Sequence, residues 1–170
     1  KKIKKKELKI YGAGHDKILK HWLENLEDWN ISRQIVWGIR LPVWYDVKQN
    51  PNVRISFLDK KNEQINGLIS ELLEKYSFEE IKSGLQSLTA PINAQFTIRQ
   101  NQADSSEQYL QETDTFDTWF SSSQWPVIAL QNNKKGDFDR FYPTTIMETA
   151  YDILMFWVMR MLMMGLYSTQ

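Results

Sequence analysis

Thr113-Asp-Thr-Phe-Asp-Thr-Trp-Phe-Ser-Ser-Ser-Gln-Trp-Pro126 is the stretch of this sequence that says most about its fold. It packs aromatic residues, two aspartates and three serines into one short segment. Neither an amphipathic helix nor an alternating strand requires that composition. A second dense segment, Phe141-Tyr-Pro-Thr-Thr-Ile-Met-Glu-Thr-Ala-Tyr-Asp-Ile-Leu-Met-Phe-Trp157, follows it closely. The two segments together are where a binding site is expected.

The second segment predicts a strand followed by a helix. Residues 141–148 are typical of a strand, with Pro143 near its start, and residues 151–166 of a helix. Apolar residues occur on nearly all sides of that helix, so it is expected to be buried. A strand that feeds a buried helix through a tight turn is the unit of a doubly wound α/β sheet. The predicted fold class is therefore α/β, Rossmann-like.

The N-terminal part, residues 1–45, predicts a helix and then a less regular region. Residues 16–28 carry apolar side chains at helical spacing, with Asp16 as the expected N-cap. Residues 28–45 have no clean period and are interrupted by Gly38 and Pro42. A short helix, a turn and a strand are expected there.

The middle of the chain changes character and predicts a small α+β insertion. Ser77-Phe-Glu-Glu80 is a capping box that opens a helix. Ile81, Leu85 and Leu88 have the spacing of its apolar stripe. The other expected elements are strands at 53–58, from 64 and at 95–99, a polar turn at 60–63, a short helix at 69–76 and a polar loop at 100–108.

The chain is therefore expected to have three parts: residues 1–45, an insertion at 46–111, and residues 112–170. The insertion shows no grouping of residues typical of a catalytic or binding site. The binding site is expected in residues 112–170.

Composition excludes several classes of protein. Of the 170 residues, 42% are hydrophobic and 25% charged, as in ordinary soluble domains. Lys plus Arg equals Asp plus Glu at 21 each, so net charge gives no argument for a nucleic-acid partner. There is no cysteine, which excludes disulfides and thiolate metal sites and fits a cytoplasmic protein.

The two histidines of the chain, His15 and His21, are too few for a metal site. The longest apolar run, residues 153–166, is too short to span a bilayer and contains Arg160.

Three ordered blocks of the sequence resemble class I aminoacyl-tRNA synthetases, and most closely their valyl members. The resemblance covers about 105 residues and leaves out the insertion. The blocks are residues 22–34 with Trp37-Gly38 and Pro42, residues 117–122 with Trp125-Pro126, and residues 141–143 and 152–157 with residues 160–165. Ala150-Tyr-Asp-Ile153 is similar to the Gly-Tyr-Asp-Ile typical of the valyl type, whereas isoleucyl members carry a Gly-Ser-Asp-Gln type motif.

The resemblance implies a pocket for the amino-acid side chain. Trp119 and Trp157 correspond to its walls, with Ile153 one helical turn before Trp157. Two flat, rigid indoles make a narrow apolar slot that suits a branched aliphatic side chain. Without the family, each tryptophan is a core aromatic.

The resemblance also implies contacts to the nucleotide. The carboxylate of Asp152 can accept hydrogen bonds from two vicinal hydroxyls, here those of the ATP ribose, beside Ala150 and Tyr151. The alternative for Asp152 is a helix N-cap. Ala150 stands where the family has a glycine that lets the backbone approach the nucleotide, and an alanine is tolerated there if its φ is negative.

Arg33 and Gln34 are open to two interpretations: they face the tRNA acceptor end, or they tie a helix to a sheet. Residues 121–123 are three serines without a nearby histidine or a nucleophile elbow, which favours a polar turn that bonds its own backbone. No catalytic residue is assigned. The family's His-Ile-Gly-His and Lys-Met-Ser-Lys-Ser motifs, where the phosphate-stabilising groups are expected, do not occur here, so a piece of a longer enzyme is expected.

The reaction that the resemblance implies has two steps. Valine attacks the α-phosphate of ATP, with Mg²⁺ assisting, and gives valyl-adenylate and pyrophosphate. A terminal ribose hydroxyl of tRNA(Val) then takes the valyl group. The full-length enzyme is expected to be monomeric, cytoplasmic and free of membrane contact.

Three alternatives remain at this stage. An isoleucyl-type synthetase is disfavoured by Tyr151-Asp-Ile153. A noncatalytic module that reuses the fold to bind RNA is disfavoured by the neutral charge. Finally, residues 46–111 could be the functional part, as a protein-interaction module.

Overall fold

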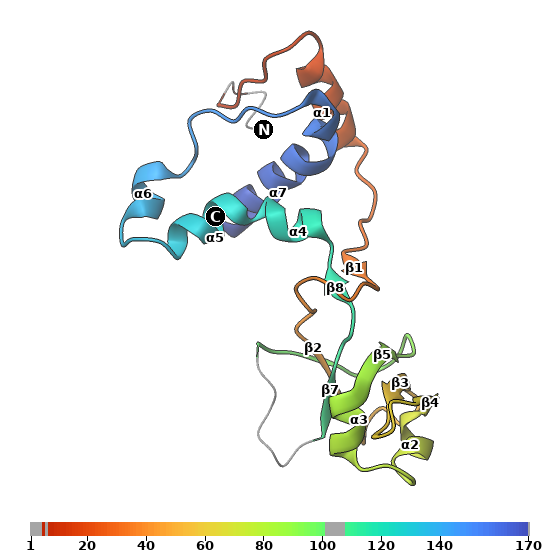
Figure 1. The fold of residues 1–170 in the computed structure, drawn as a ribbon. Coiled ribbons are helices and arrows are strands. Elements are labelled where there is room, and N and C mark those ends of the chain that lie inside the picture. The colour runs from red at the N-terminus through yellow and green to blue at the C-terminus, as the bar shows by residue number, and fades with distance from the viewer. Residues whose placement is uncertain (1–4, 6, 101–107, 170) are drawn as a thin grey trace. The chain divides into compact units, whose positions relative to one another are not determined.

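A computed structural model of the chain describes residue 5, residues 7–100 and residues 108–169. Contacts divide the chain into two compact units (Figure 1). The helical unit combines the residues up to Ile31 with those from Asp117 onward, and the sheet unit runs from Ser32 to Phe116. The polypeptide therefore passes between the units twice.

The main sheet of the sheet unit has three antiparallel strands in the order β4-β3-β5. The central strand β3 (Arg54–Leu58) pairs with β4 (Gln64–Leu68) on one side and with β5 (Leu85–Thr89) on the other. Ile55 and Phe57 of β3 are 2% and 0% exposed, as expected for the inward positions of an alternating strand. The strands expected at 53–58 and from 64 are confirmed.

The turn from β3 to β4 is built by one side chain. Asp59 Oδ1 accepts hydrogen bonds from the backbone N–H groups of Lys61 (2.8 Å) and Glu63 (2.9 Å). Asn62 takes a positive φ of 61°, which Asn tolerates better than most residues. The polar turn expected at 60–63 is confirmed.

Two short helices, α2 (Ile69–Leu72) and α3 (Phe78–Gly84), contribute to the same core. Ser77 caps α3, because its side chain accepts a hydrogen bond from the backbone N–H of Glu80, as the capping box predicts. The buried core cluster consists of Val47, Val53, Ile55, Phe57, Ile69, Leu72, Phe78, Ile81, Leu88 and Leu110.

The apolar stripe predicted for α3 was wrong at two of its three positions. Leu85 and Leu88 lie in β5, since the helix ends at Gly84. Gly84 approaches the backbone of β3 so closely that a Cβ there would lie 2.0 Å from the carbonyl oxygen of Leu58. Contact with the sheet ends the helix, and the sequence after it pairs as a strand.

A second antiparallel sheet has the order β6-β2-β7, and a third pairs β1 with β8. The strands are β1 (Ser32–Arg33), β2 (Val43–Asp46), β6 (Thr97–Ile98), β7 (Tyr109–Gln111) and β8 (Thr115–Phe116). The strand expected at 95–99 is confirmed at its centre, and β2 confirms a strand at the end of residues 28–45. The short helix expected in residues 28–45 was wrong: β1 and an irregular loop occupy its place. The loop expected at 100–108 lies almost entirely outside the described residues.

The helical unit contains helices only, as far as the structure describes it (Figure 1). They are α1 (His15–Glu24), α4 (Thr118–Ser123), α5 (Trp125–Gln131), α6 (Asp137–Phe141), a 3₁₀ turn (Tyr151–Ile153), a π-helical turn (Leu154–Val158) and α7 (Met159–Ser168). The helix expected at 16–28 is confirmed as α1, although it ends at Glu24. Its N-cap is Gly14, in the left-handed conformation, and Asp16 lies in the first turn instead.

Two expectations for the C-terminal segment were wrong. Residues 141–148 form no strand, since α6 ends at Phe141 and irregular chain follows. The helix expected at 151–166 is present, but it is not buried: only Met159 and Gly165 of α7 are buried, while Met163 and Leu166 are 41% and 44% exposed. Apolar residues on all sides predict burial only where neighbouring elements cover every side.

The mixture of helices and strands that the sequence predicts is therefore present. Every strand pair in the described part of the chain is antiparallel, so the parallel sheet of a doubly wound fold is not among these elements. None of the helices in the described ranges combines the length and the apolar character needed to cross a membrane.

Candidate functional site

An aromatic cluster in the helical unit contains one of the predicted pocket residues. Trp119 of α4 stacks on Phe156 of the π-helical turn, with ring centroids 5.1 Å apart and planes at 28°. Trp22 of α1 approaches the same Phe156 ring at 6.4 Å, and Trp29 meets Phe120 edge-on at 6.1 Å. Trp119 remains 36% exposed, so one part of the indole contacts protein and another faces outward. The cluster thus combines packing with an accessible aromatic surface.

Asp117 sets the position of Trp119 in this cluster. It is the N-cap of α4, and its Oδ1 accepts hydrogen bonds from the backbone N–H groups of Trp119 (2.8 Å) and Phe120 (3.3 Å). A capped first turn fixes the backbone from which both rings project. The Asp-Thr-Trp-Phe sequence therefore orients its aromatic residues through its own aspartate.

Arg160 of α7 lies between two indoles of the cluster. Its guanidinium carbon is 4.1 Å from the ring centroid of Trp29 and 5.1 Å from that of Trp119. Nη1 donates a hydrogen bond to the carbonyl oxygen of Phe156 at 2.8 Å. Such a cation is attracted to the negative faces of the rings. Arg160 therefore holds Trp29, Trp119 and the π-helical turn in one arrangement.

Sequence reasoning missed Trp29 and Phe156 and gave Arg160 no definite partner. Phe156 and Arg160 are four residues apart, the spacing of neighbours on a helix face, which was an available signal. Nothing local connects either residue to Trp29, which is far away in sequence and comes close only through the fold.

Trp157 has a buried indole nitrogen that lacks a hydrogen-bond partner within the described ranges. Buried polar groups are normally bonded, so an orphaned donor costs free energy in this state of the protein. Ile153, one turn earlier, is half-buried. The structure places the neighbour of Trp157, Phe156, against Trp119. The assignment of Trp119, Ile153 and Trp157 to one pocket stays a prediction.

Asp152 has an exposed carboxylate and does not cap a helix. The N-cap of its 3₁₀ turn is Ala150, and no side-chain cap bond is formed there. The alternative role predicted for Asp152, that of a helix N-cap, was therefore wrong. Nor does Asp152 follow the strand that was expected at residues 141–148, because irregular chain runs from residue 142 to residue 150.

Ala150 and Tyr151 flank this carboxylate. Ala150 has φ −64° and ψ 145°, an extended conformation in which an alanine is as relaxed as a glycine. The condition on which the alanine was expected to be tolerated is therefore met. Tyr151 is 74% exposed and stacks near His15, with ring centroids 6.2 Å apart. Tyr151 and Asp152 are thus accessible side by side.

The serines that follow Trp119 bond to their own helix. Ser123 is fully buried and donates to the carbonyl oxygen of Phe120 at 2.8 Å, and Ser121 donates to that of Asp117 at 3.5 Å. Hydroxyls committed to backbone carbonyls are not activated nucleophiles. The predicted bonding to the local backbone is confirmed, but the predicted polar turn was wrong, since the three serines lie in α4.

Arg33 and Gln34 belong to the sheet unit. Arg33 lies in β1, is partly buried, and donates from Nη1 to the carbonyl oxygen of Ser32 at 2.7 Å. Gln34 follows β1 and is exposed. Both interpretations of this pair, tRNA contact and structural support, stay predictions.

Among the described residues of the sheet unit, Tyr45 has a distinctly altered proton affinity. Burial raises the pKa of Tyr45 to about 12 from its ordinary 10.0, and the negative charge of Glu112, which also accepts the Tyr45 hydrogen bond at 3.2 Å, adds to the rise. Glu112 Oε1 also accepts from the backbone N–H of Thr113 at 2.7 Å. The pair supports a turn, and no reactive group lies beside it among the contacts described.

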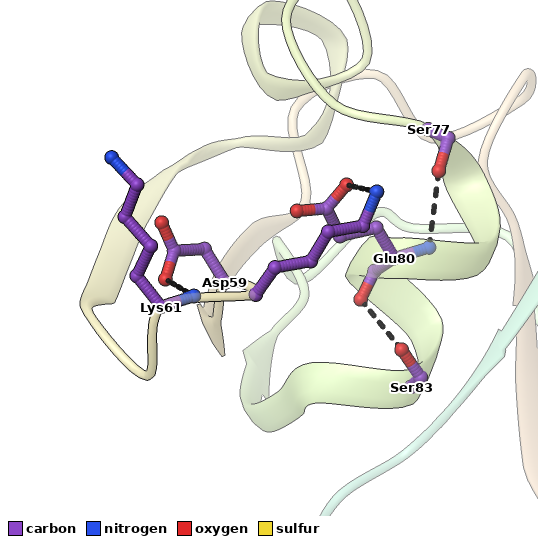
Figure 2. A network of polar contacts seen from close by, with 6 residues as sticks. Asp59, Lys61, Ser77, Glu80 and Ser83 are labelled. Atoms are coloured by element: carbon purple, nitrogen blue, oxygen red, sulfur yellow. Dashed lines mark hydrogen bonds and ion pairs between the residues drawn. The ribbon is translucent and has the colours of Figure 1, made fainter.

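A polar groove beside α3 is also structural in character (Figure 2). Lys60 Nζ lies 3.5 Å from Glu80 Oε2, and Ser83 donates to the carbonyl oxygen of Glu80 at 3.0 Å. Asp59 closes the β3–β4 turn and Ser77 caps α3, so these bonds stabilise the turn and the helix separately, and the Lys60–Glu80 ion pair links the two. Nowhere in the described ranges do three or more His, Cys, Asp or Glu residues gather to hold a metal ion.

Comparison with known proteins matches the whole chain to one family. The family described as tRNA synthetases class I (I, L, M and V) matches residues 1–170. The chain is 38% identical over 164 residues to a valine--tRNA ligase of Coxiella burnetii, covering 96% of this chain and 14% of that protein. It is 36% identical over 169 residues to a chloroplastic/mitochondrial valine--tRNA ligase of Arabidopsis thaliana, which covers 98% of this chain and 14% of that protein. A valine--tRNA ligase of Borreliella burgdorferi is 35% identical over 170 residues, which cover 99% of this chain and 15% of that protein.

The chain thus spans about a seventh of the length of these curated relatives. The match also runs through residues 46–111, which the three-block resemblance had left out. No solved structure matches the chain.

Proposed function

This chain belongs to the class I tRNA synthetase family, and we propose that it is a segment of a valine–tRNA ligase. The observation that carries the proposal is similarity along almost the entire chain to relatives named valine--tRNA ligase, at 35 to 38% identity in the three cases above. As the full-length enzyme, it joins valine to tRNA(Val) with ATP through valyl-adenylate. We further propose that the enzyme is cytoplasmic and monomeric and that it acts without membrane contact.

We propose that the helical unit belongs to the Rossmann-like catalytic domain of that enzyme. Ordered blocks of the family lie in both of its segments. The exposed apolar residues of α7 fit this role, since a sheet supplied by further chain would cover them. The sheet unit carries the insertion, with no assigned chemistry.

In this proposal the valine side chain binds to an apolar surface formed by Trp119, Ile153 and Trp157. A partly exposed indole and a half-buried isoleucine suit a small branched side chain. The stack on Phe156 and the contact with Arg160 support Trp119 from behind, so the pocket wall is held before substrate arrives.

Asp152 accepts hydrogen bonds from the ribose hydroxyls of ATP, with Ala150 and Tyr151 beside it. Its exposure and its freedom from capping support this role. No residue of the chain is assigned to the chemical step. The described residues form no metal-binding group, so we assign them no Mg²⁺ ligand; the ion accompanies ATP as part of that substrate.

The test is a titration of the 170-residue chain with a non-hydrolysable valyl-adenylate analogue, followed by tryptophan fluorescence. We expect a saturable change that the isoleucyl analogue does not produce. Asp152→Asn keeps the shape but loses the charge that strengthens hydrogen bonds, which weakens binding about 10-fold or more. Asp139→Asn, at an exposed aspartate of α6, is the matched control and leaves binding unchanged.

Equal affinity for the valyl and isoleucyl analogues would contradict the valine assignment. If Asp152→Asn and Asp139→Asn bound the valyl analogue alike, the ribose assignment would be wrong even where valine selectivity was observed.

A further inference from the structure

The guanidinium of Arg160 contacts two elements of the helical unit at once. Its carbon lies 5.1 Å from the ring centroid of Trp119 in α4, and its Nη1 donates to the carbonyl oxygen of Phe156 at 2.8 Å. The first contact is to a side chain of α4, and the second is to the backbone of the π-helical turn. Arg160 therefore couples the position of the Trp119 ring to that of the turn.

A third segment keeps the guanidinium itself in place. Trp29 lies far before α4 in the sequence, and its ring centroid is 4.1 Å from the guanidinium carbon of Arg160. Arg160 is half-buried, so part of its charge is withdrawn from water and the attraction to the rings is stronger than at the surface. Indoles on two sides restrict the movement of this planar cation.

Trp119 depends on such contacts because α4 is short. The helix has six residues, and Asp117 fixes the backbone of its first turn but leaves the side-chain torsions of Trp119 to be set by its neighbours. Phe156 stacks on the Trp119 ring at 5.1 Å, and Arg160 adds its charge to the same ring. With the ring 36% exposed, these contacts decide how firmly its plane is held.

The π-helical turn carries the other residues of the proposed valine pocket. Trp157 lies within it and Ile153 directly before it. Turns of this kind are frequent at functional sites. Because Arg160 bonds to the backbone of this turn and contacts Trp119, it links the residues that would stand on either side of the valine side chain.

We propose that Arg160 is a positioning residue that determines the preference for valine over isoleucine, by keeping Trp119 and the π-helical turn from moving apart. The inference rests on the proposed function, which places the valine side chain against Trp119, Ile153 and Trp157. Isoleucine is larger than valine by one methylene group, so a pocket rejects it only if its walls do not yield. Arg160 touches no substrate in this proposal and acts through Trp119.

The size of the effect follows from the contact that is removed. The cation–π contact of a half-buried cation changes an equilibrium by about 5- to 30-fold. Without it, displacement of Trp119 by a larger side chain becomes easier by at most that factor. The preference for the valyl over the isoleucyl analogue is therefore expected to fall about 5- to 30-fold in Arg160→Met. Affinity for the valyl analogue should change much less, since valine fits without displacing Trp119.

The experiment measures both adenylate analogues on the 170-residue chain and on each variant. Tryptophan fluorescence gives the Kd of the valyl analogue, and competition against it gives that of the isoleucyl analogue. The quantity compared is the ratio of the two constants on the same sample. Partial unfolding raises both constants by the same factor and leaves their ratio unchanged. The ratio thus separates a positioning role from a contribution to stability alone.

Three variants complete the design. Arg160→Lys keeps the charge but lacks the planar fork that meets a ring and a carbonyl together, so it should restore part of the preference. Phe156→Leu removes the ring stacked on Trp119 and should lower the preference about 2- to 13-fold. Phe156 is 41% exposed, so that change leaves the core intact. Val127→Ala, the matched control, truncates a side chain of α5 that is 4% exposed, and should lower stability without changing the ratio.

A ratio within about 2-fold of the unaltered value in Arg160→Met overturns the inference. An equal fall in Val127→Ala overturns it too, because general loosening of the unit would then be the cause. If Arg160→Met does not fold, an unchanged preference in Phe156→Leu has the same meaning. Absence of valyl binding in the unaltered chain removes the proposed function and this inference with it. Valyl-selective binding that Arg160→Met leaves equally selective removes this inference alone.

Discussion

Gly84 is the position at which the fold of the sheet unit is most sensitive to one added carbon. It is the last residue of α3 and lies against the central strand β3. A Cβ built at Gly84 would be 2.0 Å from the carbonyl oxygen of Leu58, 3.0 Å from its carbonyl carbon and 3.1 Å from its nitrogen. The obstacle is backbone, so no side-chain rotation relieves it. Gly84→Ala therefore requires α3 or β3 to move.

The magnitude follows from that geometry. Real Cβ atoms essentially never lie closer than 3.0 Å to another heavy atom, so a shift of about 1 Å is needed. Overpacking a well-packed site costs about 1–3 kcal/mol, and the upper end applies because β3 is hydrogen-bonded on both sides. Alanine regains up to about 1 kcal/mol over glycine in a helix. The expected net loss is about 2 kcal/mol, or about 8–16 °C in the melting temperature of a unit this size.

The assay is hydrogen exchange followed by mass spectrometry in low concentrations of denaturant. It reports the free energy of opening for peptides of β3 and β5 separately from those of the helical unit. The matched control is Gly67→Ala in β4, in the same sheet. Its Cβ would meet only the side chain of Leu72, at 3.3 Å or more. That side chain can give way, so the change is expected to stay within about 1 kcal/mol.

Unchanged exchange of the β3 and β5 peptides in Gly84→Ala would refute the reasoning, because it would show that α3 does not approach β3 as described. Equal destabilisation by both substitutions would refute it too, since the distinction between backbone and side-chain obstacles would then have no effect.

Two other predictions concern charges. Tyr45 has a pKa of about 12 in the folded protein against an ordinary 10.0, so the unfolded chain releases this proton at lower pH than the folded chain does. The free energy of unfolding should therefore fall as the pH rises from 10 to 12. Urea denaturation at pH 9 and 11 measures this fall, and Tyr45→Phe should lack the part of it that is due to Tyr45. Arg160→Met removes the cation between Trp29 and Trp119 and should cost the helical unit about 1–2 kcal/mol, with Arg160→Lys intermediate. Full stability of Arg160→Met in a fluorescence-detected denaturation would show that the cation–π contacts contribute nothing.

The sequence predicted correctly those features whose cause lies within a few residues. The capping box at Ser77 and the polar turn after β3 are examples, because a serine or aspartate side chain satisfies backbone donors two to four positions ahead. The condition set for Ala150 is local too, and its φ of −64° meets that condition. The ordered family blocks are also a property of sequence, and the comparisons bear them out.

Features decided by distant contacts were predicted poorly. Leu85 and Leu88 have the spacing of a helix, but the approach of Gly84 to Leu58 ends α3 and leaves them to pair with β3. The helix expected in residues 28–45 gave way to β1, whose partner β8 lies more than eighty positions away. In each case a non-local partner outweighed a weak local preference.

In the candidate site, too, some features follow from the sequence and others only from the fold. The sequence by itself determined only which residues are candidates for binding, because aromatic side chains, a carboxylate and their spacing are visible in Trp119, Asp152 and Trp157. Only the tertiary structure decided how Trp119 is supported, since Phe156 and Arg160 reach it from another helix and Trp29 completes the arrangement from the opposite end of the chain. Attraction between a cation and two rings acts over a few ångströms, and only the folded chain brings these groups that close.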